Sequence, residues 1–197
     1  MTVKDKSKSR GRPRAFDREK ALERAQALFH AQGYEGVGVA ALAQAMEINP
    51  PSLYAAFGSK AALFDEILGR YARASPLLEA LDMAKASPAT VLADVLHKAA
   101  ILYSADPATL GCMVLEGGRG TDADAACRAR GCRDASVQAM RDFVARTHPD
   151  KADVVADYMT AVMSGLSADA RAGHSTQRLT AIADMAALAI KAMLTPD

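Results

Sequence analysis

Apolar residues recur at intervals of three and four along most of the chain, a spacing that places them on one face of an α-helix. The first such segment runs from Asp17, a favoured N-cap residue, to Gly33, a residue type that often ends helices. A second segment, Val39–Met46, predicts a two-turn helix whose apolar positions are Val39, Leu42, Ala43 and Met46. Both segments predict amphipathic helices that pack on a common core.

The stretch that follows predicts a short helix beginning at Pro50. Asn49 is a favoured N-cap residue, and proline suits the first helical position because its missing N–H would have no partner there. Leu53 and Phe57 lie four residues apart and point toward the core. The remaining side chains are small apart from Tyr54, so the outer face lacks the Lys and Glu residues of an ordinary solvated helix. Such a bare face indicates that a large partner approaches it.

Further helices are predicted over the rest of the chain. Gly58 ends the short helix and Ser59 caps the next one, which continues to Tyr71 and is kinked or ended by Pro76. The remaining predicted segments are 88–103, a short helix from Asp106, 121–146, 150–172 and 175–194. On the 88–103 helix, the predicted inner face consists of Val91, Leu92, Val95, Leu96, Ala99 and Leu102. The fold class is therefore all-α, with about nine helices.

Two of these helices form a recognisable pair. Val39–Met46 and the helix from Pro50 are joined by the tight turn Glu47–Ile48–Asn49, which contains an apolar residue. This is the helix-turn-helix arrangement, whose second helix can enter the major groove of DNA. We therefore expect DNA as a partner.

The charge distribution supports the same expectation. The net charge is only +1, but residues 1–73 hold 12 Lys and Arg against 8 Asp and Glu, a net +4. Six of these cations lie in residues 1–15, which are too polar to fold alone and predict a flexible basic arm. Such an arm is either a solubilising tail or a DNA-binding arm with Arg12 or Arg14 in a minor groove. The helix-turn-helix favours the second interpretation.

Composition excludes several other classes. No apolar run is long enough to cross a bilayer and no signal peptide is evident, so we expect a cytoplasmic protein. No sequence motif of a nucleophile elbow, a phosphate-binding loop or paired catalytic carboxylates is present, so an enzyme is not expected. The four histidines are scattered and do not predict a zinc site, and we expect no metal and no cofactor.

Residues 10–71 resemble the DNA-binding domain of the TetR (tetracycline-repressor-like) transcriptional regulators. The motifs that carry the resemblance are Ala27–Leu28–Phe29 with Gly33–Tyr34, Leu42–Ala43, Ser52–Leu53–Tyr54, and Phe57–Gly58–Ser59–Lys60 leading to Leu63–Phe64. In that family the third helix reads the major groove, and the residues aligned with Tyr54 and Lys60 contact phosphates. The resemblance thus implies a DNA-binding set of Arg12, Arg14, Val39, Ala40, Asn49, Pro50, Pro51, Ser52, Tyr54, Ala55 and Lys60.

The chain departs from the family pattern at several positions. Glu47 replaces the usual turn glycine, which predicts that this position does not require a positive φ. Pro51 stands where many members have glycine, and Ala40 stands where some members carry a side chain that reads the bases. Ala61 and Ala62 stand where an acidic residue often completes a capping box, which predicts a less firm start to the fourth helix. The helix that begins at Pro50 has few side chains that can form hydrogen bonds with bases. We therefore expect sequence specificity to depend on DNA shape and on the basic arm.

The resemblance also implies the domain organisation: a flexible basic arm over 1–15, a helix-turn-helix DNA-binding domain over 16–60, and a larger helical ligand-binding and dimerisation domain over 61–197. The last two predicted helices carry more apolar surface than one small domain easily buries, and family members form homodimers through them. The predicted interface residues are Val155, Tyr158, Val162, Ile182, Met185, Ala189 and Met193. Alternatively, these residues complete the core of a single subunit.

A ligand pocket is implied by the family. The predicted lining residues are Tyr71, Tyr103, Met113, Met140, Phe143, Met163 and Leu166, and the implied effector is a small, apolar or partly apolar molecule. The expected function is a repressor released from a palindromic operator when the effector favours the DNA-incompetent state.

The three cysteines leave a second hypothesis open. We interpret Cys112, Cys127 and Cys132 as structural, because Cys127 and Cys132 are five residues apart on a predicted helix and do not lie one above the other. An odd number of cysteines also does not suggest a disulfide framework and fits a reducing compartment. The alternative is a redox- or metal-responsive helical sensor with a degenerate DNA-binding segment, in which Cys127, beside two arginines, would be a reactive thiol.

Overall fold

The computed structural model describes residues 16–82 and 86–195, and all of its regular structure is helical. The predicted arm with Arg12 and Arg14 lies outside the described residues. The helices are α1 (Arg18–Gly36), α2 (Val39–Ala45), α3 (Pro50–Phe57), α4 (Lys60–Arg73), α5 (Pro76–Asp82), α6 (Pro88–Ser104), α7 (Met113–Gly117), α8 (Ala123–Ala145), the 3-10 turn η1 (Pro149–Lys151), α9 (Ala152–Arg171) and α10 (Thr176–Leu194). The predicted all-α class is confirmed.

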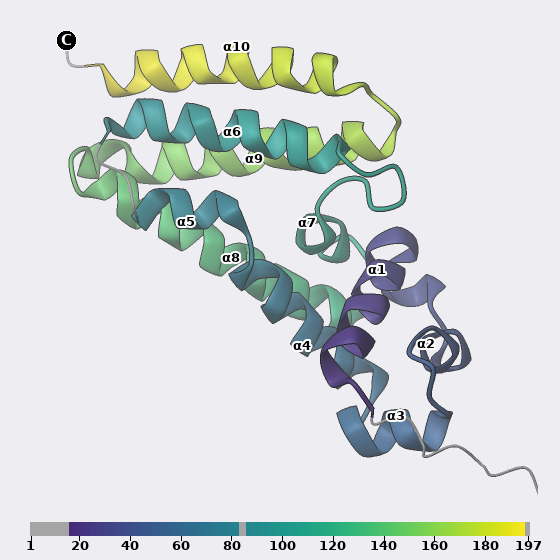
Figure 1. Ribbon diagram of the computed structural model, residues 1–197. Helices are drawn as coiled ribbons and strands as arrows, with labels where there is room; N and C mark the ends of the chain where they lie inside the picture. Colours follow the sequence, from purple (N-terminus) through teal and green to yellow (C-terminus); the bar gives the residue numbers. More distant parts are fainter. Residues whose placement is uncertain (1–15, 83–85, 196–197) are drawn as a thin grey trace, which may run out of the picture.

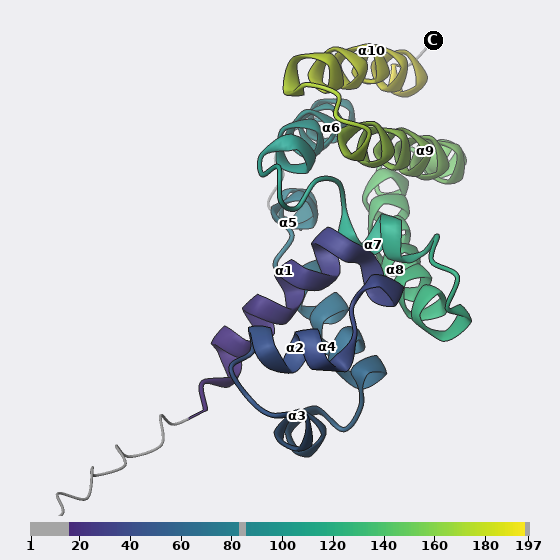
Figure 2. The same ribbon diagram turned by 90° about the vertical axis from the view of Figure 1, so that its right-hand side faces the viewer.

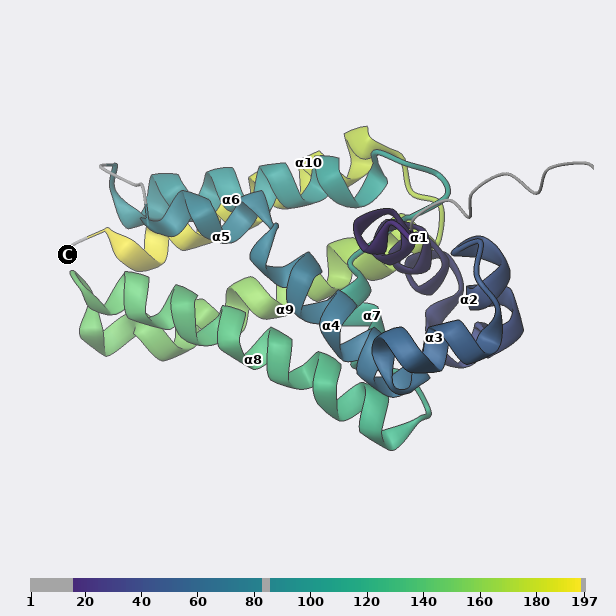
Figure 3. The same cartoon turned by 60° about the horizontal axis from the view of Figure 1, so that its bottom comes forward.

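The molecule is elongated, with α3 at one end and α10 at the other (Figures 1 and 2). Helix α1 packs on α2 and α4, and α4 runs from this small bundle into the body of the molecule (Figure 1). In the body, α10 packs along α6, and α8 packs along α9 (Figure 3). Helix α4 therefore connects the end that carries α3 with the larger bundle.

Local capping explains where most helices begin. Asp17, Asn49, Ser59, Ser87, Asp122 and Ser175 each accept a hydrogen bond from a backbone N–H in the first turn of the following helix. Asn49 accepts from the Ser52 N–H at 2.8 Å, and Ser59 accepts from the Ala62 N–H at 3.0 Å. The start of α4 is thus capped without an acidic residue at Ala61 or Ala62.

The turn between α2 and α3 corrects one prediction. Glu47 has φ 57°, so this position does adopt the left-handed conformation. The reason is the hydrogen-bonded ending of α2: the Ile48 N–H reaches the Ala43 carbonyl at 3.0 Å, and the Glu47 N–H reaches the Gln44 carbonyl at 3.1 Å. This paired arrangement is the Schellman motif, which requires a left-handed residue just after the helix.

Three other details differ from prediction. On α6, Leu102 is 43% exposed, whereas Tyr103, at 2%, takes the inner position. The segment from Asp106 is a turn and not a helix. The Asp106 carboxylate stabilises this turn, because it accepts hydrogen bonds from the Ala108 N–H at 2.9 Å and from the Thr109 hydroxyl at 3.1 Å. Helix α1 continues to Gly36, but it is kinked at Gly33, where φ is 73°.

Candidate nucleic-acid interface and ligand cavity

The outer face of α3 is exposed, as the sequence predicts. Leu53 and Phe57 are buried beneath it, and the Arg18 guanidinium carbon lies 4.8 Å from the centre of the Phe57 ring. Around the exposed side lie Asn49, Pro50, Pro51, Ser52, Tyr54 and Ala55, none of which carries a charge. Tyr54 is 48% exposed and projects beyond its small neighbours. This end of the molecule offers a narrow, uncharged, protruding helix.

Other predicted DNA-binding residues border this helix. Ala40 is exposed and Val39 is half-buried at the start of α2. Lys60, the first residue of α4, has its Nζ atom 4.0 Å from the centre of the Tyr34 ring. This cation–π contact holds the ammonium group against the C-terminal end of α1.

Ion pairs connect α4 with α1. Arg18 donates to the Glu66 carboxylate at 2.7 Å, and Arg70 pairs with Glu19. The Arg18 guanidinium holds the pKa of the Glu66 carboxyl below its usual range. Because these pairs are exposed, each stabilises the fold only slightly, but together they fix the angle between α1 and α4.

A cavity of about 410 Å³ lies within the body of the molecule, at the junction with α1 and α4. Of the predicted lining residues, Tyr71, Tyr103, Met140 and Met163 line it. Met113, Phe143 and Leu166 do not, because they are buried in contacts between helices. Sequence reasoning did not assign the lining residues His30, Cys112 and Arg133, which reach the cavity from α1, the loop before α7, and α8. These three residues come together only through the packing of distant helices, so their spacing in the sequence does not predict that they share a cavity.

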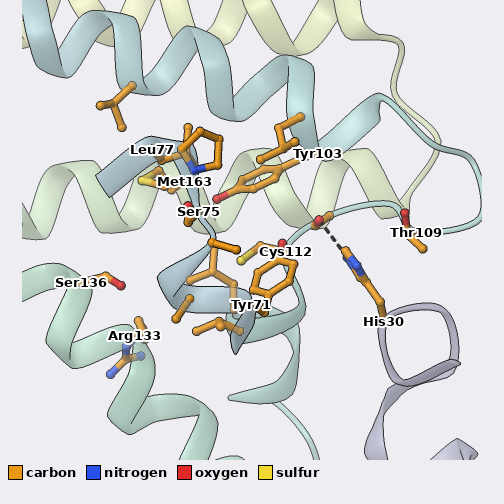
Figure 4. A pocket seen from close by; sticks show the side chains of 18 of the residues that line it. His30, Tyr71, Ser75, Leu77, Tyr103, Thr109, Cys112, Arg133, Ser136 and Met163 are labelled. Atoms are coloured by element: carbon orange, nitrogen blue, oxygen red, sulfur yellow. Dashed lines mark hydrogen bonds between the residues drawn. The ribbon is translucent and has the colours of Figure 1, made fainter. Parts of the chain in front are cut away.

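The polar end of the cavity is built around Cys112. Figure 4 shows its sulfur between the side chains of Tyr71 and Tyr103. Burial raises the pKa of both phenols and of the Cys112 thiol, so all three groups stay protonated at neutral pH.

His30 connects this cavity with α1. Its Nε2 atom lies 3.1 Å from the Gly111 carbonyl oxygen, to which it donates (Figure 4). Its ring lies edge-on to Tyr71 at 5.5 Å between centroids. Desolvation lowers the pKa of His30, so the ring is neutral near pH 7. A residue of α1 thus contacts both α4 and the loop that leads to α7.

The far bundle exposes an apolar stripe. Ile182, Met185 and Leu188 on α10 are 41%, 69% and 62% exposed, and Val154 on α9 is 56% exposed. Of the residues predicted for a dimer interface, Tyr158, Val162, Ala189 and Met193 are half-buried. Val155 must be corrected, since its side chain is fully buried inside the subunit and cannot reach a partner.

Neither a membrane segment nor a metal centre is found in the described part of the chain. No helix there has both the length and the apolar character to span a bilayer. The same residues contain no group of three or more His, Cys, Asp or Glu side chains arranged to hold a metal ion. Cys112 is buried, Cys127 is exposed and Cys132 is half-buried, and all three are free thiols.

A helix-turn-helix with a protruding second helix, joined by α4 to a helical body that encloses a cavity, defines a DNA-binding transcriptional regulator. Comparison with known proteins agrees. The family "Bacterial regulatory proteins, tetR family" matches residues 21–67. The HTH-type transcriptional repressor BdcR of Escherichia coli (strain K12) is 45% identical over 196 residues, covering 98% of this chain and 99% of BdcR.

Two further relatives extend the comparison. The repressor ComR, also from E. coli K12, is 31% identical over 188 residues, covering 89% of this chain and 90% of ComR. A cysteine mutant of the TetR family regulator CifR, solved with 26-bp double-strand operator DNA, superposes with a TM-score of 0.81 and is 36% identical, covering 91% of this chain and 99% of CifR. The chain therefore belongs to the TetR family. It is a DNA-binding transcriptional repressor and not an enzyme, and none of these relatives supports the redox-sensor alternative.

Proposed function

We propose that this repressor binds a palindromic operator as a homodimer and releases it when a small molecule occupies the cavity beside Tyr71 and Tyr103. The observation that carries the proposal is the exposed, uncharged outer face of α3, bordered by Tyr54 and Lys60. A small, bare helix can approach base edges closely, while the phenol and the ammonium group are suited to phosphates. The operator complex of CifR supports this use of the same fold.

The DNA contacts that we propose keep the predicted set. Asn49, Pro50, Pro51, Ser52 and Ala55 would face the major groove. Tyr54 and Lys60 would contact phosphates, with Val39 and Ala40 alongside. The arm over residues 1–15, with Arg12 and Arg14, would follow the neighbouring minor groove. We assign residues 16–60 to the DNA-binding domain and 61–197 to ligand binding and dimerisation, and we propose that the protein acts in the cytoplasm.

Dimerisation would use the apolar stripe on α9 and α10. Val154, Ile182, Met185 and Leu188 are large apolar side chains that a single subunit leaves in water. Burying them against the same stripe of a second copy gives a two-fold symmetric pair, which matches the symmetry of a palindrome. Tyr158, Val162, Ala189 and Met193 would flank the contact.

Release would act through the walls of the cavity. His30 belongs to α1 and Tyr71 belongs to α4, and both line the same space. We expect the helices to have one arrangement that binds DNA and a shifted arrangement that does not. A ligand that binds the shifted arrangement more tightly would weaken DNA binding, and the ratio of its two affinities limits the size of this effect. The contact of His30 with Gly111 ties α1 to the effector-binding body and supports this coupling.

The DNA assignment is tested by Tyr54→Phe and Lys60→Met on a duplex selected from fragments of the source genome. Each variant should weaken binding, and Lys60→Met should lower the slope of log affinity against log salt by about one. The matched control is Lys98→Met, which removes an exposed lysine of α6 that pairs with Asp94. If both variants bind like this control, the proposed interface is wrong.

A further inference from the structure

The chemistry of the cavity narrows the class of ligand that it can hold. Tyr71, Tyr103 and Cys112 all line its polar end, and the Cys112 sulfur lies between the two tyrosine side chains (Figure 4). Sulfur is a weak acceptor, so the two tyrosine hydroxyls gain little from it. A ligand oxygen placed in the same position would accept a stronger hydrogen bond. The polar end is therefore arranged to donate to a ligand.

The charged side chains that line the cavity are committed elsewhere. Arg133 donates from Nε and Nη2 to the Asp134 carboxylate at 3.0 and 2.8 Å, and its guanidinium lies away from the tyrosines in Figure 4. The Asp106 carboxylate caps its own turn through Ala108 and Thr109. Among the described lining residues, the ligand thus meets no uncommitted charge, and His30 is neutral.

The rest of the lining is mostly apolar. Leu77, Leu81, Val95, Val137 and Met140 contribute side chains from the three helices α5, α6 and α8. The volume of about 410 Å³ falls in the range of small-molecule sites. A carboxylate or an ammonium group placed here would lose its hydration without gaining an ionic partner. An apolar molecule with a single acceptor would lose little hydration and would gain the tyrosine donors.

We propose that the effector is a neutral, largely apolar molecule with one acceptor oxygen, such as a ketone, aldehyde, ester or ether, held by the hydroxyls of Tyr71 and Tyr103. This inference rests on the proposed function, because it names the occupant of the cavity through which the operator is released. Tyr71 then has two roles, since it contacts the ligand and belongs to α4, the helix that leads to α3.

Three probes of the same size separate the possibilities. Acetylnaphthalene is a neutral ketone, isopropylnaphthalene is a hydrocarbon of the same shape, and naphthoate carries a negative charge. Relative affinities follow from the rise of the unfolding temperature with probe concentration. We expect the ketone to bind roughly three- to tenfold more tightly than the hydrocarbon, the gain typical of one net hydrogen bond. We expect naphthoate to bind more weakly than both.

Two variants locate the preference. Tyr71→Phe and Tyr103→Phe remove one hydroxyl each and keep the ring, so the advantage of the ketone over the hydrocarbon should fall in each and vanish in the double variant. Tyr34→Phe is the matched control, since it removes the hydroxyl of a half-buried tyrosine of α1 that does not line the cavity. This control variant should bind the ketone more tightly than the hydrocarbon by the same factor as the wild-type protein.

The inference is overturned if naphthoate binds as tightly as the ketone, if the double variant keeps the preference, or if no probe binds the wild-type protein. Operator binding by the same preparation separates this failure from failure of the proposed function. A protein that binds its operator but shows no preference for the ketone refutes only the ligand class. A protein that prefers the ketone while its operator affinity stays unchanged on probe binding refutes the release mechanism and leaves the ligand class standing.

Discussion

Glu47 shows how a single residue can hold a functional turn under strain. Among the described residues, it is the non-glycine residue with a positive φ, and it lies directly between the two helices of the DNA-binding pair. Its carboxylate pairs with Arg24 at 2.9 Å, and Arg24 also donates to the Ala45 carbonyl at the end of α2 at 3.2 Å. The ion pair partly offsets the steric cost of the left-handed conformation.

This strain leads to a stability prediction. Glu47→Gly and Glu47→Ala both lose the exposed ion pair, but only glycine relieves the left-handed backbone. The glycine variant should therefore be more stable than the alanine variant by about 1 kcal/mol. Urea unfolding of the two proteins measures this difference. Equal midpoints would show that the turn carries no strain.

His30 predicts a dependence of stability on pH. Desolvation lowers its folded-state pKa, so the unfolded chain binds a proton more readily, and the folded protein should lose stability as the pH falls below about 6.5. The charged groups that act on the ring are Arg171, Asp106 and Glu116. His30→Gln should reduce the loss of unfolding temperature between pH 7.5 and pH 5 relative to the wild type. An identical pH profile in the variant would assign the dependence to other groups.

At the scale of the elements, capping links stability and DNA binding. Asn49→Ala should destabilise the protein by about 1 kcal/mol, because the N–H of Ser52 loses its acceptor. It should also weaken DNA binding, since α3 begins there. Ser87→Ala removes a cap of the same kind from α6, far from α3, and should cost similar stability while leaving DNA binding unchanged. Calorimetry and duplex titration test both variants, and equal losses of affinity would contradict a special role for α3.

The same scale shows what sequence can predict. Helix starts at Asn49, Ser59 and Ser87 depend on residues within one turn, so residue patterns predict them. On α6, Tyr103 is buried where Leu102 was predicted to be. Which of the two residues is buried depends on the helices that pack against α6, and the spacing of apolar residues does not identify these helices. The burial of Val155 and the gathering of His30 and Cys112 at the cavity likewise result from packing between distant segments.

At the scale of the whole molecule, self-association should depend on the stripe on α9 and α10. Met185→Glu places a charge at a position that is 69% exposed in the subunit and buried in the proposed dimer. Sedimentation should then find single subunits at concentrations where the wild type is paired. Gln177→Glu adds the same charge at an exposed polar position of α10 and should leave the pair intact. A paired Met185→Glu protein would show that the interface lies elsewhere.

The central claim is that a symmetric pair presents two copies of α3 to successive major grooves of one duplex. The most direct test inserts about five base pairs, half a helical turn, between the half-sites of the selected operator and compares its affinity with that of a duplex lengthened by a full turn of about ten. The half-turn insertion places the two half-sites on opposite sides of the DNA, so we predict a much larger loss of affinity than for the full turn. Equal affinities for both duplexes would contradict paired recognition through α3.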